Sequence, residues 1–272
     1  MSDDRNIALW RIAAALERLS PPPPPAVDPL AHAAYAWTSG RLAASGLAAQ
    51  PIDALVGIDR QKAALLGNLR RLAAGHAAHD VLLWGARGTG KSALVKAGVA
   101  AVQAEGGRLA LVEVGRTEVL PDVFAALGAV KRAFAVFVDD LGFDSAGEAR
   151  ALRSMLEGGA AARPANVRLL VTSNRRHLLP RDIAEQESAI NPRDSIDDSL
   201  ALADRFGLSL GFHALDQDGY LLIVAGYAGR LGLSFDPADA VQWATRRGSR
   251  SGRVAWQYVV ELAGRAGRSE VD

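Results

Sequence analysis

The sequence contains no cysteine. Disulfide bonds, zinc sites built from thiolates and cysteine nucleophiles are therefore all excluded. The sequence also lacks any run of about 18 consecutive apolar residues, so we expect no membrane-spanning helix. Its first residues, Met1 to Asp4, are acidic where a secretory signal would be basic. We therefore expect a cytoplasmic protein without a signal peptide.

An excess of either charge is also missing. Lys and Arg number 31 and Asp and Glu number 30, which leaves a formal net charge of +1. Any attraction to nucleic acid must then come from a local cluster of charge rather than from the whole protein. The 272 residues, 49% of them hydrophobic, are enough for one globular domain of ordinary size and a smaller companion.

The first 50 residues differ in composition from the rest. Residues 5–19 carry an apolar stripe at helical spacing, formed by Leu9, Ile12, Leu16 and Leu19. The prolines from Pro21 to Pro25 predict a polyproline II spacer. A ligand for a proline-binding domain is the alternative, although no basic pair flanks the prolines. The alanine-rich segment 29–44 predicts a second helix, and we therefore predict an N-terminal helical extension over residues 1–50 with a linker at 21–25.

A glycine-rich loop follows the apolar run 81–84 and precedes a helical pattern at 93–105. Its residues are Gly85, Ala86, Arg87, Gly88, Thr89, Gly90, Lys91 and Ser92. Small residues let consecutive backbone N–H groups and a helix N-terminus point at phosphate oxygens. Lys91 adds a mobile cation for the β- and γ-phosphates, and the Ser92 hydroxyl can bind Mg²⁺. The motif predicts a site for a nucleoside triphosphate.

Strand and helix patterns alternate after Pro51, which is typical of a parallel sheet covered by helices. The expected strands are 80–84, 108–114, 134–138, 167–171 and 208–212, and the expected helices of this part are 60–74, 121–130 and 145–158. Beyond residue 216 the pattern is helical, over 217–231, 237–247 and 251–265. We therefore predict an α/β fold with a five-stranded parallel sheet between helices over 51–215, and a small all-helical domain over 216–272.

Two acids end the third expected strand. Asp139 and Asp140 follow an apolar run, and the ends of parallel strands form the crevice in which ligands bind. We expect Asp139 to hold Mg²⁺ and Asp140 to polarise the attacking water. A solvated turn is the alternative, but the phosphate loop about 50 residues earlier favours the functional interpretation.

Two further polar residues occupy positions that would suit catalysis. Asn174 ends the fourth expected strand and could position water without adding charge, although an asparagine there is more often a turn residue. Arg205 precedes the fifth strand and could reach the γ-phosphate of a neighbouring subunit. Its alternative is an ordinary ion pair with Asp204 or Asp198.

The C-terminal part is locally basic. The stretch from residue 246 to residue 268 holds the six arginines Arg246, Arg247, Arg250, Arg253, Arg265 and Arg268, against the single acid Glu261. Arg253 opens a helix with an apolar face, which favours a nucleotide-sensing role for this residue. The others fit either solvated surface charge or a patch that binds nucleic acid. Trp84, Trp243 and Trp256 fit packing, and His177 and His213 lack partners at metal-ligand spacing.

These motifs resemble those of the AAA+ ATPase superfamily, over about residues 51–267. Gly85 to Ser92, with Ala93 after it, is similar to Walker A, and Phe137 to Asp140 is similar to Walker B. The resemblance implies that Val56, Gly57 and Ile58 contact the adenine. It also implies that Asn174 is sensor 1, Arg205 is a finger acting in trans, and Arg253 is sensor 2. The amino-acid sequences of segments 82–92, 172–181 and 204–207 are more similar still to those of an uncharacterised bacterial family of ATP-binding proteins in this superfamily.

The sequence departs from the superfamily pattern at one acid. Walker B usually ends in Asp-Glu, and here it ends in Asp139-Asp140, one methylene shorter. We expect the shorter acid to affect the rate of ATP turnover more than it affects nucleotide binding. Asp144 is the alternative candidate for the acid that polarises the water. No aromatic pore loop follows the second expected strand, where the chain runs from Gly115 to Glu118. Loading, docking or switching is therefore favoured over polypeptide unfolding.

The resemblance implies a Mg²⁺-dependent ATPase that works as a ring, with a homohexamer as the expected assembly. Its ligands are ATP and Mg²⁺, and its macromolecular partner is unknown, with nucleic acid as one possibility through the basic C-terminal part. The main alternative is a slow, nucleotide-switched binding module that docks to nucleic acid or protein. A P-loop kinase using the arginines of 175–181 as a lid is a third possibility, but it leaves Asn174 and the helical C-terminal domain unexplained.

Overall fold

Short segments, most of them apolar, form the strands of a single sheet. The computed structural model describes residues 27–141, 163–174 and 205–269, with Leu152, Met155, Leu156 and scattered positions between 6 and 18. The strands are β1 (Ala34–Thr38), β2 (Arg41–Ser45), β3 (Val81–Gly85), β4 (Leu109–Val114), β5 (Ala133–Val138), β6 (Val167–Ser173) and β7 (Leu208–Phe212). Their order across the sheet is β2-β1-β4-β5-β6-β3-β7. All neighbours are parallel except β1 and β2.

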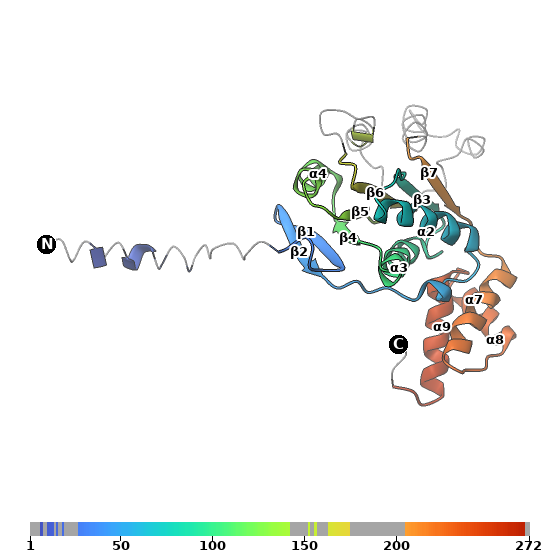
Figure 1. Ribbon diagram of the computed structural model, residues 1–272. Helices are drawn as coiled ribbons and strands as arrows, with labels where there is room; N and C mark the ends of the chain where they lie inside the picture. Colours follow the sequence, from blue (N-terminus) through green and yellow to red (C-terminus); the bar gives the residue numbers. More distant parts are fainter. Residues whose placement is uncertain are drawn as a thin grey trace, which may run out of the picture.

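The helices cover both faces of this sheet (Figure 1). They are α2 (Asp59–Ala73), α3 (Lys91–Ala104) and α4 (Leu120–Gly128). Successive side chains of a strand point to opposite faces, so Phe134 and Val136 of β5 pack with α4, whereas Ala135 and Phe137 pack with α2 and α3. Because both faces of the central sheet are covered, the inner strands β3 and β5 are apolar throughout, as in other parallel sheets.

Three further helices form a separate hydrophobic core beside the sheet. They are α7 (Gln217–Arg230), α8 (Pro237–Arg246) and α9 (Gly252–Arg265), drawn in orange and red in Figure 1. Tyr220, Tyr258 and Val224 are fully buried among them. We call this unit the lid. The expected α/β fold with a parallel sheet and a helical C-terminal unit is confirmed, and each of the five expected strands is present.

The prediction of a helix over 29–44 is wrong. This segment forms the antiparallel hairpin of β1 and β2, which extends the sheet from five strands to seven. Ser39 and Gly40 both have positive φ, 50° and 76°, and they join Thr38 to its cross-strand partner Arg41. A two-residue turn of this handedness matches the twist of a hairpin. The alanines suggested a helix, whereas the Ser-Gly pair was the informative signal.

Buried polar contacts attach the hairpin to the domain. The hydroxyl of Tyr35, which is 0% exposed, donates to the backbone oxygen of Asp28 at 2.8 Å and accepts from the amide of His32 at 2.9 Å. Arg132 donates to the backbone oxygens of His32 at 2.7 Å and Leu109 at 3.1 Å. The sheet therefore includes residues that the sequence analysis had assigned to the N-terminal extension.

Other expectations for the N-terminal half fall largely outside the described residues. Residues 10–13 are helical and exposed, but Leu9, Leu16, Leu19 and the prolines 21–25 are not described. The helix expected from Ser145 is represented only by Leu152, Met155 and Leu156, which are helical and buried. None of the helices in the described part combines the length and apolar character needed to cross a lipid bilayer.

Substitution of two buried tyrosines tests whether the Tyr35 hydroxyl holds the hairpin of β1 and β2 in place. We expect Tyr35→Phe to lower the free energy of unfolding by about 1–3 kcal/mol, because it removes the hydrogen bonds of a buried hydroxyl with Asp28, His32 and, at 3.5 Å, Arg132. Tyr220→Phe is the matched control. The Tyr220 hydroxyl is buried without a partner among the described residues, and burial raises its pKa to about 12. Its removal should be neutral or stabilising in urea unfolding, and equal losses for both variants would contradict this account of the hairpin.

Candidate functional site

The glycine-rich loop lies between β3 and α3, at the carboxyl end of the sheet. Gly85 has a φ of 126°, and a Cβ atom there would lie 2.0 Å from the backbone oxygen of Phe212. The amide of Ala86 donates to that same oxygen at 3.0 Å. The loop is therefore pressed against β7 so closely that only glycine fits at its first position.

Lys91 is the buried cation at the centre of the loop. Its side chain is 5% exposed, and its Nζ donates to the backbone oxygens of Gly85 at 3.0 Å and Ala86 at 2.8 Å. A third bond, of 2.9 Å, goes to Oδ1 of Asn174. Burial lowers the pKa of Lys91, and the nearby carboxylates of Asp140 and Asp139 oppose this shift. The ammonium is thus positioned by neutral oxygens that phosphate oxygens could replace.

Asp139 lies beside the start of α3. Ser92 Oγ donates to its Oδ1 at 2.6 Å, and Thr172 Oγ1 donates to the same oxygen at 2.5 Å. Magnesium prefers such hard oxygen ligands, and it is usually held by one or two carboxylates with phosphate oxygens and water. The two residues that the sequence analysis assigned to Mg²⁺ are therefore in contact, and their chemistry suits the ion.

Thr172 was missed by the sequence analysis. Its hydroxyl accepts from the amide of Asp140 at 2.8 Å while donating to Asp139, so it joins the ends of the adjacent strands β5 and β6. The Thr-Ser-Asn run at the end of β6 was the available signal. It became informative only once β6 was known to lie beside β5.

Asp140 has an unusual backbone and two side-chain partners. Its φ of 54° is left-handed, which is uncommon for a residue with a Cβ and typical of functional sites. Its Oδ1 accepts from Nδ2 of Asn174, and its Oδ2 lies 3.5 Å from a guanidinium nitrogen of Arg87. Asn174 therefore connects Asp140 to Lys91, across three neighbouring strands.

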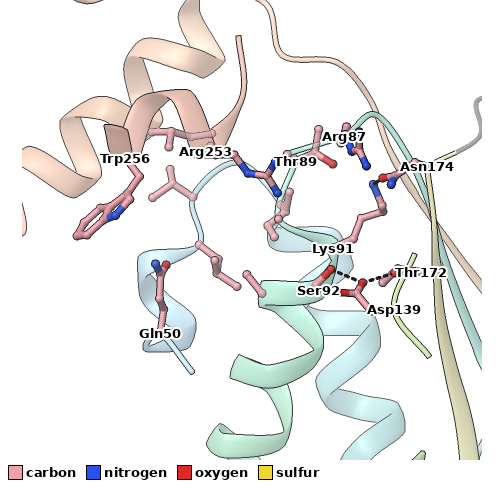
Figure 2. Close-up of a pocket in the computed structure, with 18 of the residues that line it drawn as sticks. Gln50, Arg87, Thr89, Lys91, Ser92, Asp139, Thr172, Asn174, Arg253 and Trp256 are labelled. Atoms are coloured by element: carbon pink, nitrogen blue, oxygen red, sulfur yellow. Dashed lines mark hydrogen bonds between the residues drawn. The ribbon is translucent and has the colours of Figure 1, made fainter. Parts of the chain in front are cut away.

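These side chains line a cavity of about 330 Å³ (Figure 2). Predicted residues that line it are Val56, Ile58, Arg87, Gly88, Thr89, Gly90, Lys91, Ser92, Ala93, Asp139, Asp140, Asn174 and Arg253. Figure 2 shows Arg253 of α9 pointing toward the loop, with Gln50 and Trp256 at the other end of the cavity. Gln50, Leu55, Ile223, Tyr227, Gly252 and Trp256 also line it and were not predicted, and the last four of these come from the lid.

Not every predicted residue reaches this cavity. Gly57 lines an adjoining cavity of about 310 Å³, which shares Val56 and Ile58 with the first. Arg205 is exposed and precedes β7, so it lies beyond the opposite end of that strand from the loop, and β7 itself spans roughly 16 Å at 3.3 Å per residue. Its assignment to a neighbouring subunit stays a prediction.

The lid contacts the loop directly at the start of α9. The amide of Gly252 donates to the backbone oxygen of Gly88 at 3.0 Å. Ser251 is buried and caps α9 by accepting from the amide of Val254 at 3.3 Å. A Cβ atom on Gly88, whose φ is 76°, would lie 3.0 Å from Cβ and Oγ of Ser251. This contact places Arg253 at the cavity.

Comparisons with known proteins identify the family and the fold of the chain. The family described as "Protein of unknown function (DUF815)" matches residues 30–266 of the chain. No curated protein matches the chain. A solved structure of the Thermotoga maritima RuvB Holliday junction branch migration motor is 17% identical, with a TM-score of 0.52 over 83% of this chain and 69% of that one.

Two other solved structures share the fold. The Aeropyrum pernix Orc1 protein in complex with DNA is 16% identical, with a TM-score of 0.53 over 82% of this chain and 66% of that one. Hsp104 with ATPγS and casein is 16% identical, with a TM-score of 0.50 over 78% of this chain and 38% of that one. All three are AAA+ ATPases, and at these identities the likeness shows the AAA+ fold.

The contact between loop and lid can be tested at Gly88. We expect Gly88→Ala to separate the start of α9 from the loop, because the new methyl group meets Ser251 and the backbone is strained. Hydrogen exchange at the amides of 252–255 should become about tenfold faster or more, as expected for about 1.4 kcal/mol of lost local stability. Gly75→Ala is the control, since Gly75 has a φ of 75° but no atom within 4 Å. Equal exchange rates at 252–255 in the two variants would show that α9 does not depend on the loop.

Proposed function

The chain belongs to the DUF815 family and has the AAA+ fold, and on this premise we propose that it is a Mg²⁺-dependent ATPase that works as a ring. In this proposal ATP turnover drives the loading, docking or remodelling of a macromolecular partner. One observation carries the proposal. Lys91, Asn174 and Asp140 are hydrogen-bonded in series at the carboxyl ends of three adjacent parallel strands, directly beside the Ser92–Asp139 pair.

The phosphates of ATP fit the loop and the first turn of α3. The backbone amides of the loop and the helix N-terminus offer donors to phosphate oxygens, and Lys91 is poised to exchange its carbonyl partners for them. Arg253 would reach the phosphates from the lid. The adenine would then lie toward Val56, Gly57 and Ile58, in the adjoining cavity.

Ser92 and Asp139 would hold the magnesium ion. When bound, the ion would supply positive charge against the developing charge of the phosphoryl group. Thr172 fixes the Asp139 carboxylate by a hydrogen bond of 2.5 Å, so this oxygen is oriented before any ligand arrives. Asp140 would accept a proton from the attacking water, and the Asn174 amide would orient that water.

A second function is supported by the partners of Asp140. Both of its carboxylate oxygens are engaged, one by Asn174 and the other by Arg87. A base that is engaged in this way, and that is shorter than the usual glutamate, suits slow hydrolysis. The protein would then act as a nucleotide-switched binding module, and single-turnover hydrolysis that is slow beside tight ATP binding would favour this alternative.

The proposal includes nucleic acid as the class of macromolecular partner and a ring as the assembly. RuvB is named as a branch migration motor and Orc1 was solved with DNA, which supports nucleic acid as the partner class. Arg205 supports a ring, with a hexamer as the expected size, because it lies a strand's length away from the loop of its own chain. A cytoplasmic location is part of the same proposal.

The phosphate-binding assignment can be tested at Lys91. We expect Lys91→Ala to abolish measurable ATP binding in isothermal titration, because the cation is lost from the centre of the loop. Lys96→Ala is the matched control. Lys96 lies on the same helix but pairs with Glu113 at 2.8 Å and does not line the cavity, so its loss should leave ATP affinity unchanged. Unchanged affinity in a folded Lys91→Ala protein would remove the assignment.

The ring can be tested by mixing variants. We expect Arg205→Ala to bind ATP normally and to hydrolyse it roughly 10³-fold more slowly, as when other trans-acting arginines are removed. Mixing it with Lys91→Ala should restore activity at interfaces that join an intact loop to an intact arginine. Activity of the wild type should also rise faster than linearly with protein concentration until the ring assembles. Inactive mixtures in which mixed rings demonstrably form would exclude Arg205 as the finger.

A further inference from the structure

A groove of about 560 Å³ lies between the phosphate loop and the lid. It is lined by residues 86–87 of the loop, by 214–215 before α7, by 244–245 at the end of α8, and by 248–250 between α8 and α9. Among the described residues, Arg87 is the one lining residue that this groove shares with the cavity of Figure 2. A ligand in the groove would therefore touch the site through a single side chain.

The groove carries positive charge that none of its described lining residues neutralises. Arg87 and Arg250 line it, and no acidic residue appears among its described lining residues. Within the described part of the chain, no carboxylate pairs with Arg250. Arg265 on the same lid differs, because it pairs with Asp239 at 3.2 Å and Glu261 at 3.0 Å. The groove is thus suited to an anion.

Two more arginines lie at the end of α8, next to the groove. Arg246 and Arg247 are both exposed. The guanidinium of Arg247 lies 3.7 Å from the centre of the Trp243 ring and donates to Gln257 at 3.2 Å. These contacts hold the Arg247 guanidinium against the lid, and because neither Arg246 nor Arg247 lines the groove, the two arginines add positive charge near it rather than a direct contact.

The lining favours a phosphate backbone as the occupant. Arginines beside the hydroxyl of Ser249 are groups that commonly contact phosphate and sugar, whereas the hydroxyl of Thr245 already donates to the backbone oxygen of Val241 at 2.9 Å. None of the described lining residues is aromatic, so the groove offers no platform on which unpaired bases would stack. Its apolar lining is mostly alanine, which gives little anchorage to the side chains of a peptide. Duplex nucleic acid, bound without regard to sequence, fits these features best.

We propose that this groove binds the phosphate backbone of duplex nucleic acid and that the bound backbone draws Arg87 away from Asp140. The Arg87–Asp140 pair is long, at 3.5 Å, and its side chains are 74% and 53% exposed, so it is weak. A phosphate in the groove offers Arg87 two oxygens in a bidentate geometry. Release of Arg87 frees Oδ2 of Asp140 to accept a proton. The second half of this inference rests on the proposed ATPase function.

Binding is tested first, without ATP, by the fluorescence anisotropy of a labelled DNA duplex. Arg250→Ala should weaken binding roughly five- to tenfold and reduce the slope of log affinity against log salt by about 1. Arg230→Ala is the control, because Arg230 is an exposed lid arginine that does not line the groove. Absence of binding at about 50 mM salt, or equal losses in both variants, would overturn the site. Equal affinity for single strands, or equal competition by poly-glutamate, would overturn the assignment to duplex backbone.

Coupling is tested by ATP turnover with saturating duplex. The wild type should be stimulated several-fold, and Arg250→Ala should keep its basal rate while requiring more duplex for the same stimulation. In Arg87→Ala, duplex should not change the rate of ATP turnover, whatever the basal rate of this variant. Duplex binding through Arg250 without any ATP hydrolysis would support the groove and contradict the proposed ATPase. Hydrolysis that is unaffected by bound duplex would contradict the coupling and leave the ATPase standing.

Discussion

The organisation of the molecule depends on one buried ammonium group. Lys91 is held by two carbonyl oxygens of its own loop and by Asn174 of the neighbouring strand, in a position that is almost closed to solvent. A buried cation costs several kcal/mol unless oxygens surround it. The loop, β3 and β6 must therefore keep their relative positions for this charge to be tolerated. The same oxygens keep the cation where a phosphate would need it.

The rest of the site is built outward from this group by short polar links. Asn174 connects Lys91 to Asp140, while Thr172 connects Asp140 to Asp139 and Ser92 hydrogen-bonds Asp139 from the start of α3. Each link joins two elements that are far apart in the sequence. Such a chain of hydrogen bonds orients several functional groups at once, and a change at one of them is felt by its neighbours.

The lid adds a second kind of control. It contacts the loop through the Gly252–Gly88 hydrogen bond and the packed Ser251, and it brings Arg253 and Trp256 to the cavity. On its other side it forms the basic groove with the loop, so Arg87 faces the cavity and the groove together. One loop thus lies between the candidate nucleotide site and a candidate partner site, which is a simple arrangement for making the two sites interdependent.

The sequence alone determined the glycine-rich loop between β3 and α3, the acids that follow β5, and the five parallel strands, because these depend on residue type at fixed local spacing. It misassigned β1 and β2, since alanine-rich segments fit a helix or a strand and only pairing with β4 decides between them. Tertiary structure also decided the role of Thr172, the lid residues of the cavity and the groove at Arg250. Each of these depends on which strands and helices are neighbours, and such long-range contacts leave no periodic trace in the local sequence.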